Sequence, residues 1–247
     1  MSRFRAGGLH FLISFFVALV LLALFWFVWY PAPMLTAIGG REIFLLIVGI
    51  DVVLGPLLTT IVFKSGKKTL KFDLTVIGVV QVAALAYGLT TLLQARPIFV
   101  AALGDKFQVV QAGEITDSNL AKTKTSLPWW GPRWVGTKEP LDLNDISELD
   151  LLETVGGGRG QLPQLHIPYE SMTQEILHRS QSIAELKKHN VAQASDIDSW
   201  LQRYGYAEND AKFQPIWIGA SKFVVMIDAK NGAIIGIAPF KSESFIK

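Results

Sequence analysis

The sequence of 247 residues contains no cysteine. This absence excludes disulfide bonds, thiol nucleophiles and metal sites built on thiolates. Histidine is also scarce, with four residues in the whole chain. Of these, His166, His178 and His189 lack the close spacing of zinc ligands. We therefore expect neither a metal ion nor any other cofactor.

Catalytic motifs are missing as well. No Gly-x-Ser-x-Gly elbow is present, and Asp196 and Asp198 are two positions apart, so on a helix they point in different directions. The glycine-rich stretch 156–160 is followed by Gln161 and not by the Lys-Ser/Thr of a phosphate-binding loop, so we predict a flexible surface loop. We expect a protein that is not an enzyme.

The positive charge is confined to one part of the chain. Residues 1–93 hold seven Lys/Arg against three Asp/Glu, whereas residues 94–247 hold 16 against 18. A nucleic-acid-binding domain needs a basic surface, which the larger part lacks. We therefore exclude nucleic acid as a partner.

Three long apolar runs, within 9–30, 42–63 and 72–93, dominate the first part of the chain. Each has about 20 residues or more, enough to cross a hydrocarbon core about 30 Å thick. The sequence predicts a membrane domain of three helices over 1–94. Residues 95–247 are predicted to form a second domain outside the membrane.

The basic residues of the short loops predict the orientation. Arg3 and Arg5 precede the first run and four lysines lie between Lys64 and Lys71, whereas the loop 31–41 carries one base. The positive-inside rule then places the N-terminus in the cytoplasm and the domain 95–247 on the other side. The first run lacks a small-residue cleavage site, so we expect an uncleaved anchor.

The second run contains a carboxylic acid and a helix breaker. Asp51 lies in the middle of this run, and Gly55 and Pro56 follow about one turn later. Ionisable side chains inside a membrane usually face a protein interior and have a function. Proline removes a backbone donor and bends a helix near the preceding turn. We predict that the charge and the kink share one site.

Two residues of the third run are predicted to join this site. Asp51 and Gln81 lie at similar depths, each about 13 Å from one end of its helix. A hydrogen bond from Gln81 to Asp51 would clamp the helices together, and Tyr87 would reach the same cavity. The alternative is that Asp51 faces a partner, and the sequence leaves both interpretations open.

Four residues of the second domain are candidates for contact with a partner. Arg96 follows the third run, and Trp129, Trp130 and Trp134 lie among prolines and glycine. Such a cluster can be a local core under a loop, a membrane-surface contact or a binding platform. We favour the local core, because aromatic side chains are more often buried than exposed.

The end of the chain predicts a small antiparallel sheet. The β-branched runs 213–218, 223–228 and 233–238 are short, and Asn231-Gly232 between the last two is typical of a hairpin turn. Helices are predicted near 144–153, 180–189 and 195–203. The second domain is therefore predicted to be α+β.

The chain resembles a known family over about residues 40–112. The motifs that carry the resemblance are Gly49 to Thr59, Asp73-Leu74, Gln81, Ala84-Leu85, Tyr87-Gly88, Ala95 to Pro97 and Asp105 to Phe107. They are similar to motifs of the type IV pilin accessory proteins of the TfpX/TfpZ kind. Lys106 replaces an expected arginine and keeps the positive charge.

The resemblance implies an inner-membrane, chaperone-like protein of type IV pilus assembly in Gram-negative bacteria. Such a protein would bind or stabilise the cognate major pilin and modulate pilus extension and twitching motility. Other pilus assembly proteins of the inner membrane and the lipid bilayer are further implied partners. The resemblance brings no known catalytic or binding residue.

Two other functional classes fit parts of the sequence. A small transporter or proton-coupled subunit could use Asp51, although one acid and one glutamine make a poor pathway and internal repeats are not visible. A membrane-anchored periplasmic sensor is the other class, but the chain has no cytoplasmic output module.

Overall fold

The computed structural model describes residues 2–30, 33–34, 38, 40–123, 126–218 and 221–242. The chain divides into two compact units, Met1–Arg96 and Pro97–Lys247. The first unit is helical, and the second combines a sheet with short helices.

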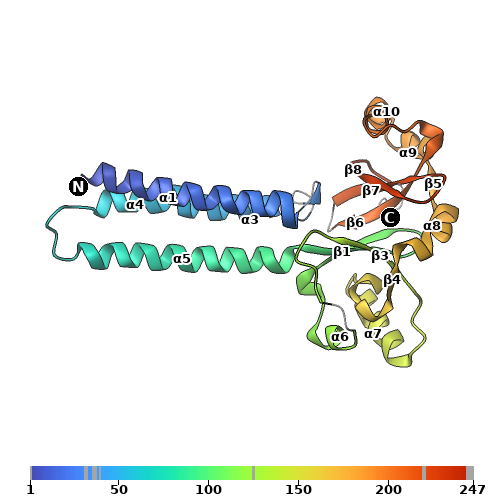
Figure 1. Cartoon of the computed structure of the whole chain (residues 1–247), viewed down its shortest axis with the longest axis horizontal. Helices are drawn as coiled ribbons and strands as arrows, with labels where there is room; N and C mark the ends of the chain where they lie inside the picture. The colour runs from blue at the N-terminus through green and yellow to red at the C-terminus, as the bar shows by residue number, and fades with distance from the viewer. Residues whose placement is uncertain are drawn as a thin grey trace. The chain divides into compact units, whose positions relative to one another are not determined.

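The helical unit contains three helices that are long and apolar enough to cross a membrane: Arg3–Trp29, Gly40–Val62 and Leu70–Ala95. Figure 1 shows them side by side. The first consists of α1 (Arg3–Leu24) and the π-helical turn η1 (Phe25–Trp29). The second consists of α3 (Gly40–Val48), the π-helical segment η2 (Gly49–Leu54) and α4 (Gly55–Val62), and the third is α5 (Leu70–Ala95).

The second helix holds the unit together, because both α1 and α5 pack on it. Small residues allow close approach at two points. A Cβ atom on Gly7 of α1 would lie 1.9 Å from Oγ1 of Thr60, and one on Gly88 of α5 would lie 2.5 Å from the Ile47 side chain. At one end, Phe25, Trp29 and Tyr30 form a core with Ile47 and Leu92.

The second unit is built on one mixed sheet of eight strands in the order β4-β3-β1-β2-β6-β7-β8, with β5 also paired to β6. Pairing is parallel between β1 and β3 and between β2 and β6, and antiparallel elsewhere. The strands are β1 (Pro97–Ala102), β2 (Phe107–Gln111), β3 (Arg133–Thr137), β4 (His166–Pro168), β5 (Gln181–Ser182), β6 (Ala211–Ile218), β7 (Ser221–Asp228) and β8 (Ile234–Ala238). The expectation of a small antiparallel sheet was therefore wrong in size and type.

The C-terminal part of that expectation is confirmed. Strands β6, β7 and β8 pair antiparallel, and Gly232 in the last turn has a φ of 74°. Positive φ at this position favours glycine, which has no Cβ to clash. The parallel pairs β1/β3 and β2/β6 were not predicted, because these strands are far apart in the sequence and meet only in the folded chain.

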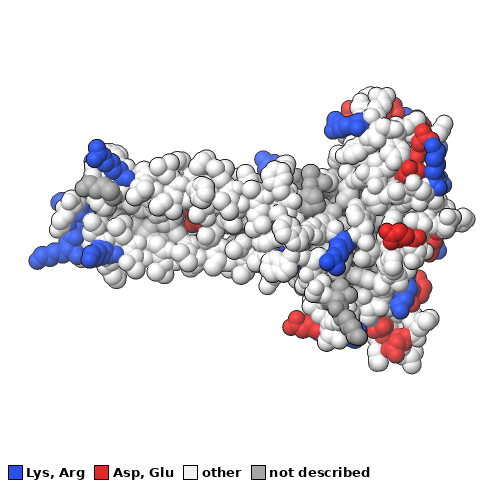
Figure 2. Space-filling view, viewed as in Figure 1, with Lys and Arg blue, Asp and Glu red and all other residues white. Residues whose placement is uncertain are grey.

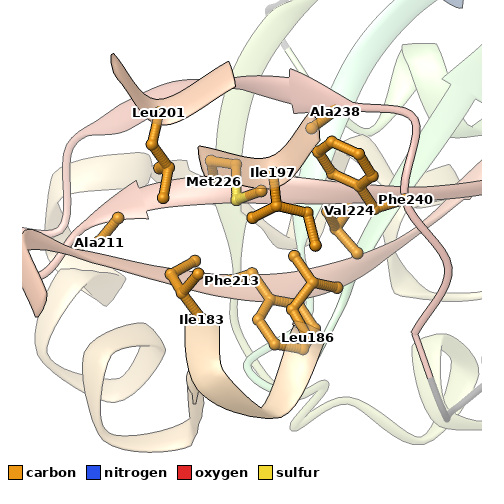
Figure 3. Packing of buried hydrophobic residues seen from close by; sticks show 10 residues of the cluster. All are labelled: Ile183, Leu186, Ile197, Leu201, Ala211, Phe213, Val224, Met226, Ala238 and Phe240. Atoms are coloured by element: carbon orange, nitrogen blue, oxygen red, sulfur yellow. The ribbon is translucent and has the colours of Figure 1, made fainter. Parts of the chain in front are cut away.

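Short helices surround the sheet (Figure 1): α6 (Asp117–Ala121), α7 (Leu143–Thr154), α8 (Thr173–Arg179), α9 (Ile183–His189) and α10 (Ala194–Arg203). Helices α9 and α10 supply Ile183, Leu186, Ile197 and Leu201 to a core that includes Phe213 of β6. Figure 3 shows these side chains converging on the C-terminal strands. Burial of such side chains, at about 1.5–3 kcal/mol each, is the main stabilising term of the unit.

Candidate functional site

The candidate site lies where the second helix changes register. In the π-helical segment η2, the N–H of Gly55 donates to the carbonyl of Ile50, five residues earlier. The next bond of this register would join residue 56 to the carbonyl of Asp51. Residue 56 is proline, which has no N–H to donate. The local sequence therefore leaves the Asp51 carbonyl without its intrahelical donor.

Gln81 of α5 satisfies this carbonyl. Its Nε2 donates a hydrogen bond to the backbone oxygen of Asp51, with the two atoms 3.2 Å apart. Gly55 provides the necessary space, because a Cβ atom there would lie 2.0 Å from Nε2 of Gln81. Gly55, Pro56 and Gln81 therefore depend on one another: Pro56 leaves the carbonyl free, Gln81 binds it and Gly55 makes room for Gln81. The predicted link between Gln81 and Asp51 exists, but it reaches the main chain of Asp51.

The Asp51 side chain faces a cavity of about 200 Å³ in the helical unit. The walls come from α1, from α3 with η2, and from α5, and are largely apolar. The polar residues of the wall are His10, Ser14, Asp51 and Gln81. Figure 2 shows one acidic spot part-way along an otherwise uncharged stretch of this unit. We call this cavity the helix groove.

His10 of α1 lies close to the second helix. Its Nδ1 lies 2.7 Å from Oγ1 of Thr59, and its side chain lines the helix groove together with Ser14. The two residues are one helical turn apart, so they share a face of α1. This four-residue spacing in an otherwise apolar helix was the signal that could have identified them.

Tyr87 does not reach the groove. Its side chain is 76 % exposed and is not part of the cavity wall. The reason is rotational: six residues separate Tyr87 from Gln81, and at about 100° per residue the two side chains point about 120° apart. The prediction that Tyr87 joins this cavity was wrong.

The contact candidates of the second domain have different surroundings. Trp129 and Trp130 are 65 % and 78 % exposed, so the local-core interpretation is wrong for them. Trp134 on β3 is partly buried, with its ring 5.7 Å from that of Phe107 in an edge-to-face arrangement. Arg96 is only 7 % exposed, which makes its guanidinium a poor contact surface. The four candidates therefore differ in exposure, and only Trp129 and Trp130 present large exposed surfaces.

The second half of the glycine-rich stretch packs against the sheet, so its interpretation as a surface loop was wrong for residues 158–160, whereas Gly156 is exposed in a turn. Gly158 and Gly160 are buried, and a Cβ atom on Gly160 would lie 2.9 Å from side-chain atoms of Ala101 and Val110. Between them, Arg159 donates to the carbonyl of Leu103, with 2.6 Å between the atoms, and forms an ion pair with Glu139. These glycines allow close backbone approach.

Two titratable side chains of the sheet unit, those of His166 and Glu114, are held by contacts with main-chain atoms. Burial lowers the pKa of His166, whose Nε2 lies 2.8 Å from the carbonyl oxygen of Gly160, and the latter contact partly offsets the effect. Glu114, whose side chain is exposed, accepts a hydrogen bond from the backbone N–H of Gln111 at 2.8 Å. Among the described residues, no group of three or more metal-ligating side chains occurs.

Comparison with known proteins identifies the family. The model of the family "Fimbrial assembly protein FimB" matches residues 1–39. The chain is 30 % identical over 233 residues to the fimbrial assembly protein of serogroup E1 from Dichelobacter nodosus, covering 92 % of this chain and 91 % of the relative. This chain belongs to the fimbrial assembly protein family.

Other relatives agree. The fimbrial assembly protein of serogroup I from the same organism is 30 % identical over 92 % of this chain and 91 % of its own length. The protein of serogroups C1 and C2 is 38 % identical over 45 % of this chain and 86 % of its own length. No solved structure gives a significant match. The resemblance to pilin accessory proteins is thus confirmed at the level of a fimbrial assembly family.

Proposed function

We propose that this fimbrial assembly protein is a non-enzymatic accessory factor of the bacterial inner membrane that binds or stabilises type IV pilin subunits and modulates their assembly. The family relationship supports a role in pilus assembly, because relatives that match nearly the whole chain are fimbrial assembly proteins. The helix groove supports the mode of action. A polar-centred groove on an apolar helical unit is suited to hold another apolar helix.

The charge distribution supports the proposed orientation. Lys and Arg gather at one end of the helical unit in Figure 2, the end that holds the N-terminus and the connection between α4 and α5. By the positive-inside rule this end faces the cytoplasm. The sheet unit after α5 is then periplasmic, where it can contact the exported part of a pilin. Exposed Trp129 and Trp130 are candidates for that contact.

The observation that carries the proposal is Asp51 in the wall of a groove formed by three apolar helices. A carboxylate is costly in such surroundings, so its presence there indicates a function. An apolar helix of another membrane protein is the partner that best covers the apolar walls of the groove. The cognate major pilin is therefore the proposed primary partner. Other inner-membrane assembly proteins are secondary ones.

The test combines genetics with capture. Deleting the gene is expected to reduce or abolish surface pili and twitching, and the full-length protein should restore both. Tagged full-length protein in mild detergent is expected to retain the cognate pilin but not an unrelated inner-membrane protein with one apolar helix. Normal piliation after deletion, together with no pilin capture, contradicts the proposal.

A further inference from the structure

The Asp51 carboxylate contains an acceptor that the described part of the chain leaves unsatisfied. Its Oδ1 atom is buried and has no hydrogen-bond partner among these residues, and the whole residue is 9 % exposed. Buried polar atoms without a partner are rare in folded proteins. An unpaired acceptor at the wall of a cavity indicates that a donor from another molecule completes the site.

Two polar side chains of the groove wall already make hydrogen-bond contacts. Nε2 of Gln81 bonds to the carbonyl of Asp51, and Nδ1 of His10 lies within hydrogen-bond distance of Thr59. Among the residues that the structure describes, no lysine or arginine lines the helix groove. An anion in apolar surroundings is stabilised most by a cationic partner that also donates a hydrogen bond.

The depth of Asp51 restricts the source of this donor. Asp51 lies eleven residues from Gly40 and eleven from Val62, the two ends of the second helix. At 1.5 Å per residue, that is about 16 Å from either end. A phospholipid headgroup remains at the membrane surface and does not reach this depth. The donor must therefore belong to an apolar segment that carries it into the membrane.

The size and rim of the groove favour a helix as that segment. About 200 Å³ is room for side chains, whereas an entire helix is about 10 Å across and must lie over the opening. The walls include the exposed apolar side chains of Ile13 on α1 and Val82 on α5. A helix lying over these rims would cover both and place a side chain or chain end next to Asp51.

We infer that the helix groove binds the apolar helix of the fimbrial subunit through a cationic N–H donor on that helix, which pairs with the Asp51 carboxylate at mid-membrane depth. This inference rests on the proposed function, since that function supplies the occupant. It specifies the chemistry: one protonated amine or guanidinium in an otherwise apolar segment. An uncharged apolar helix would leave Asp51 unsatisfied and bind more weakly.

Photo-crosslinking in native membranes tests the location. A benzophenone amino acid at Val82, which lines the groove, is expected to crosslink to the pilin helix. The control position is Val80, which is similarly exposed but is absent from the groove wall and lies about 160° away around α5. Equal pilin crosslinking from both positions, or lipid adducts alone at Val82, would overturn the inference.

Two substitutions test the chemistry in the full-length protein. Asp51→Asn keeps the shape but removes the charge, and is expected to reduce pilin capture at least about tenfold, as for a lost buried charge pair. Asp51→Glu keeps the charge and should retain more capture than Asp51→Asn. Equal capture by the two variants and the wild type would refute a charge pair. Pilin would then still bind, so the proposed function would survive.

Two bulky substitutions test the groove even if the Asp51 variants fail to accumulate. Val82→Trp is expected to block the groove and reduce pilin capture, whereas Val80→Trp should not. Both native side chains are exposed and contribute little to the core, so neither variant should impair folding. Unchanged capture by Val82→Trp would rule out this groove as the binding site. Loss of capture in every variant and in the wild type would instead refute the proposed function.

Discussion

Gln81 donates its side-chain amide to the main-chain carbonyl of Asp51, across two helices and with 3.2 Å between the atoms. This carbonyl is the one that Pro56 leaves without a donor in the π-helical register of η2. The glutamine therefore compensates for a proline on another helix. In apolar surroundings, where water is absent, such compensation is required for an irregular helix to persist.

Replacing Gln81 by leucine is expected to destabilise the helical unit by about 1 kcal/mol, because the Asp51 carbonyl loses its donor. Denaturation of the full-length protein in detergent, followed by circular dichroism, measures this effect. Gln94→Leu is the matched control, since Gln94 is exposed at the end of the same helix. An equal loss in both variants would show that the hydrogen bond is unimportant.

A double-mutant cycle tests the reason for that bond. Pro56→Ala restores an N–H at position 56, which can then serve the Asp51 carbonyl. Gln81→Leu is therefore expected to cost less in the Pro56→Ala background than in the wild type. Strictly additive losses would contradict the idea that Gln81 replaces the missing proline donor.

Gly55→Ala is expected to be destabilising by about 1–3 kcal/mol, as typical for overpacking. The added Cβ would lie 2.0 Å from Nε2 of Gln81, so either the hydrogen bond or the helix contact must shift. Gly49→Ala is the control on the same helix, since a Cβ there meets no atom within 4 Å. Its expected effect is neutral or slightly stabilising. The midpoint of denaturation in detergent compares the two.

The stability of the sheet unit is expected to fall as the pH drops below about 6.5, the ordinary pKa of histidine. Burial lowers the pKa of His166 in the folded state, so the unfolded chain takes up this proton first. Between the two pKa values, acid therefore favours unfolding, and above both the proton has no effect. Hydrogen exchange of strand β4 in the full-length protein at several pH values measures this dependence.

Two substitutions isolate the contribution of His166. His166→Gln should flatten this part of the pH profile, because glutamine does not titrate. Exposed His178 provides the control, and His178→Gln should leave the profile unchanged. A profile that keeps its slope without His166 would assign the effect to another group.

The three tryptophans are expected to separate into two classes. Trp134→Ala should destabilise the sheet unit by about 2 kcal/mol or more, because its ring packs on Phe107. Trp130→Ala should change stability by no more than about 0.5 kcal/mol, as for an exposed side chain. If Trp130 contacts the pilin, this variant reduces pilin capture while folding normally. Thermal unfolding and capture assays on the same preparations distinguish these outcomes.

Local patterns were sufficient for several parts of the fold. The length of each apolar run predicts a helix that can cross a membrane, because that property depends only on consecutive residues. The antiparallel pairing of β6, β7 and β8 follows from neighbouring strands and a glycine at the turn. The polar centre of the second helix was also visible, since Asp51 and Pro56 interrupt an apolar run.

The depth of a residue along its helix could be counted from the sequence. The direction in which its side chain points around the helix was not taken into account for Tyr87. Counting residues placed Asp51 and Gln81 at the same level, and their hydrogen bond confirmed it. The same counting also placed Tyr87 near the groove, where a rotation of about 100° per residue excludes it. The pairing of the sheet's N-terminal strands could not be predicted from local patterns, because 30 residues of chain lie between β1 and β3.

The sequence by itself determined which segments are apolar, where the charges lie and which helix contains an acid and a proline, because these are properties of consecutive residues. Only the tertiary structure decided that Gln81 bonds to the main chain of Asp51, leaving its carboxylate in a groove that His10 also lines. The physical reason is that a helix fixes the direction of each side chain, but contacts with other helices decide which directions meet.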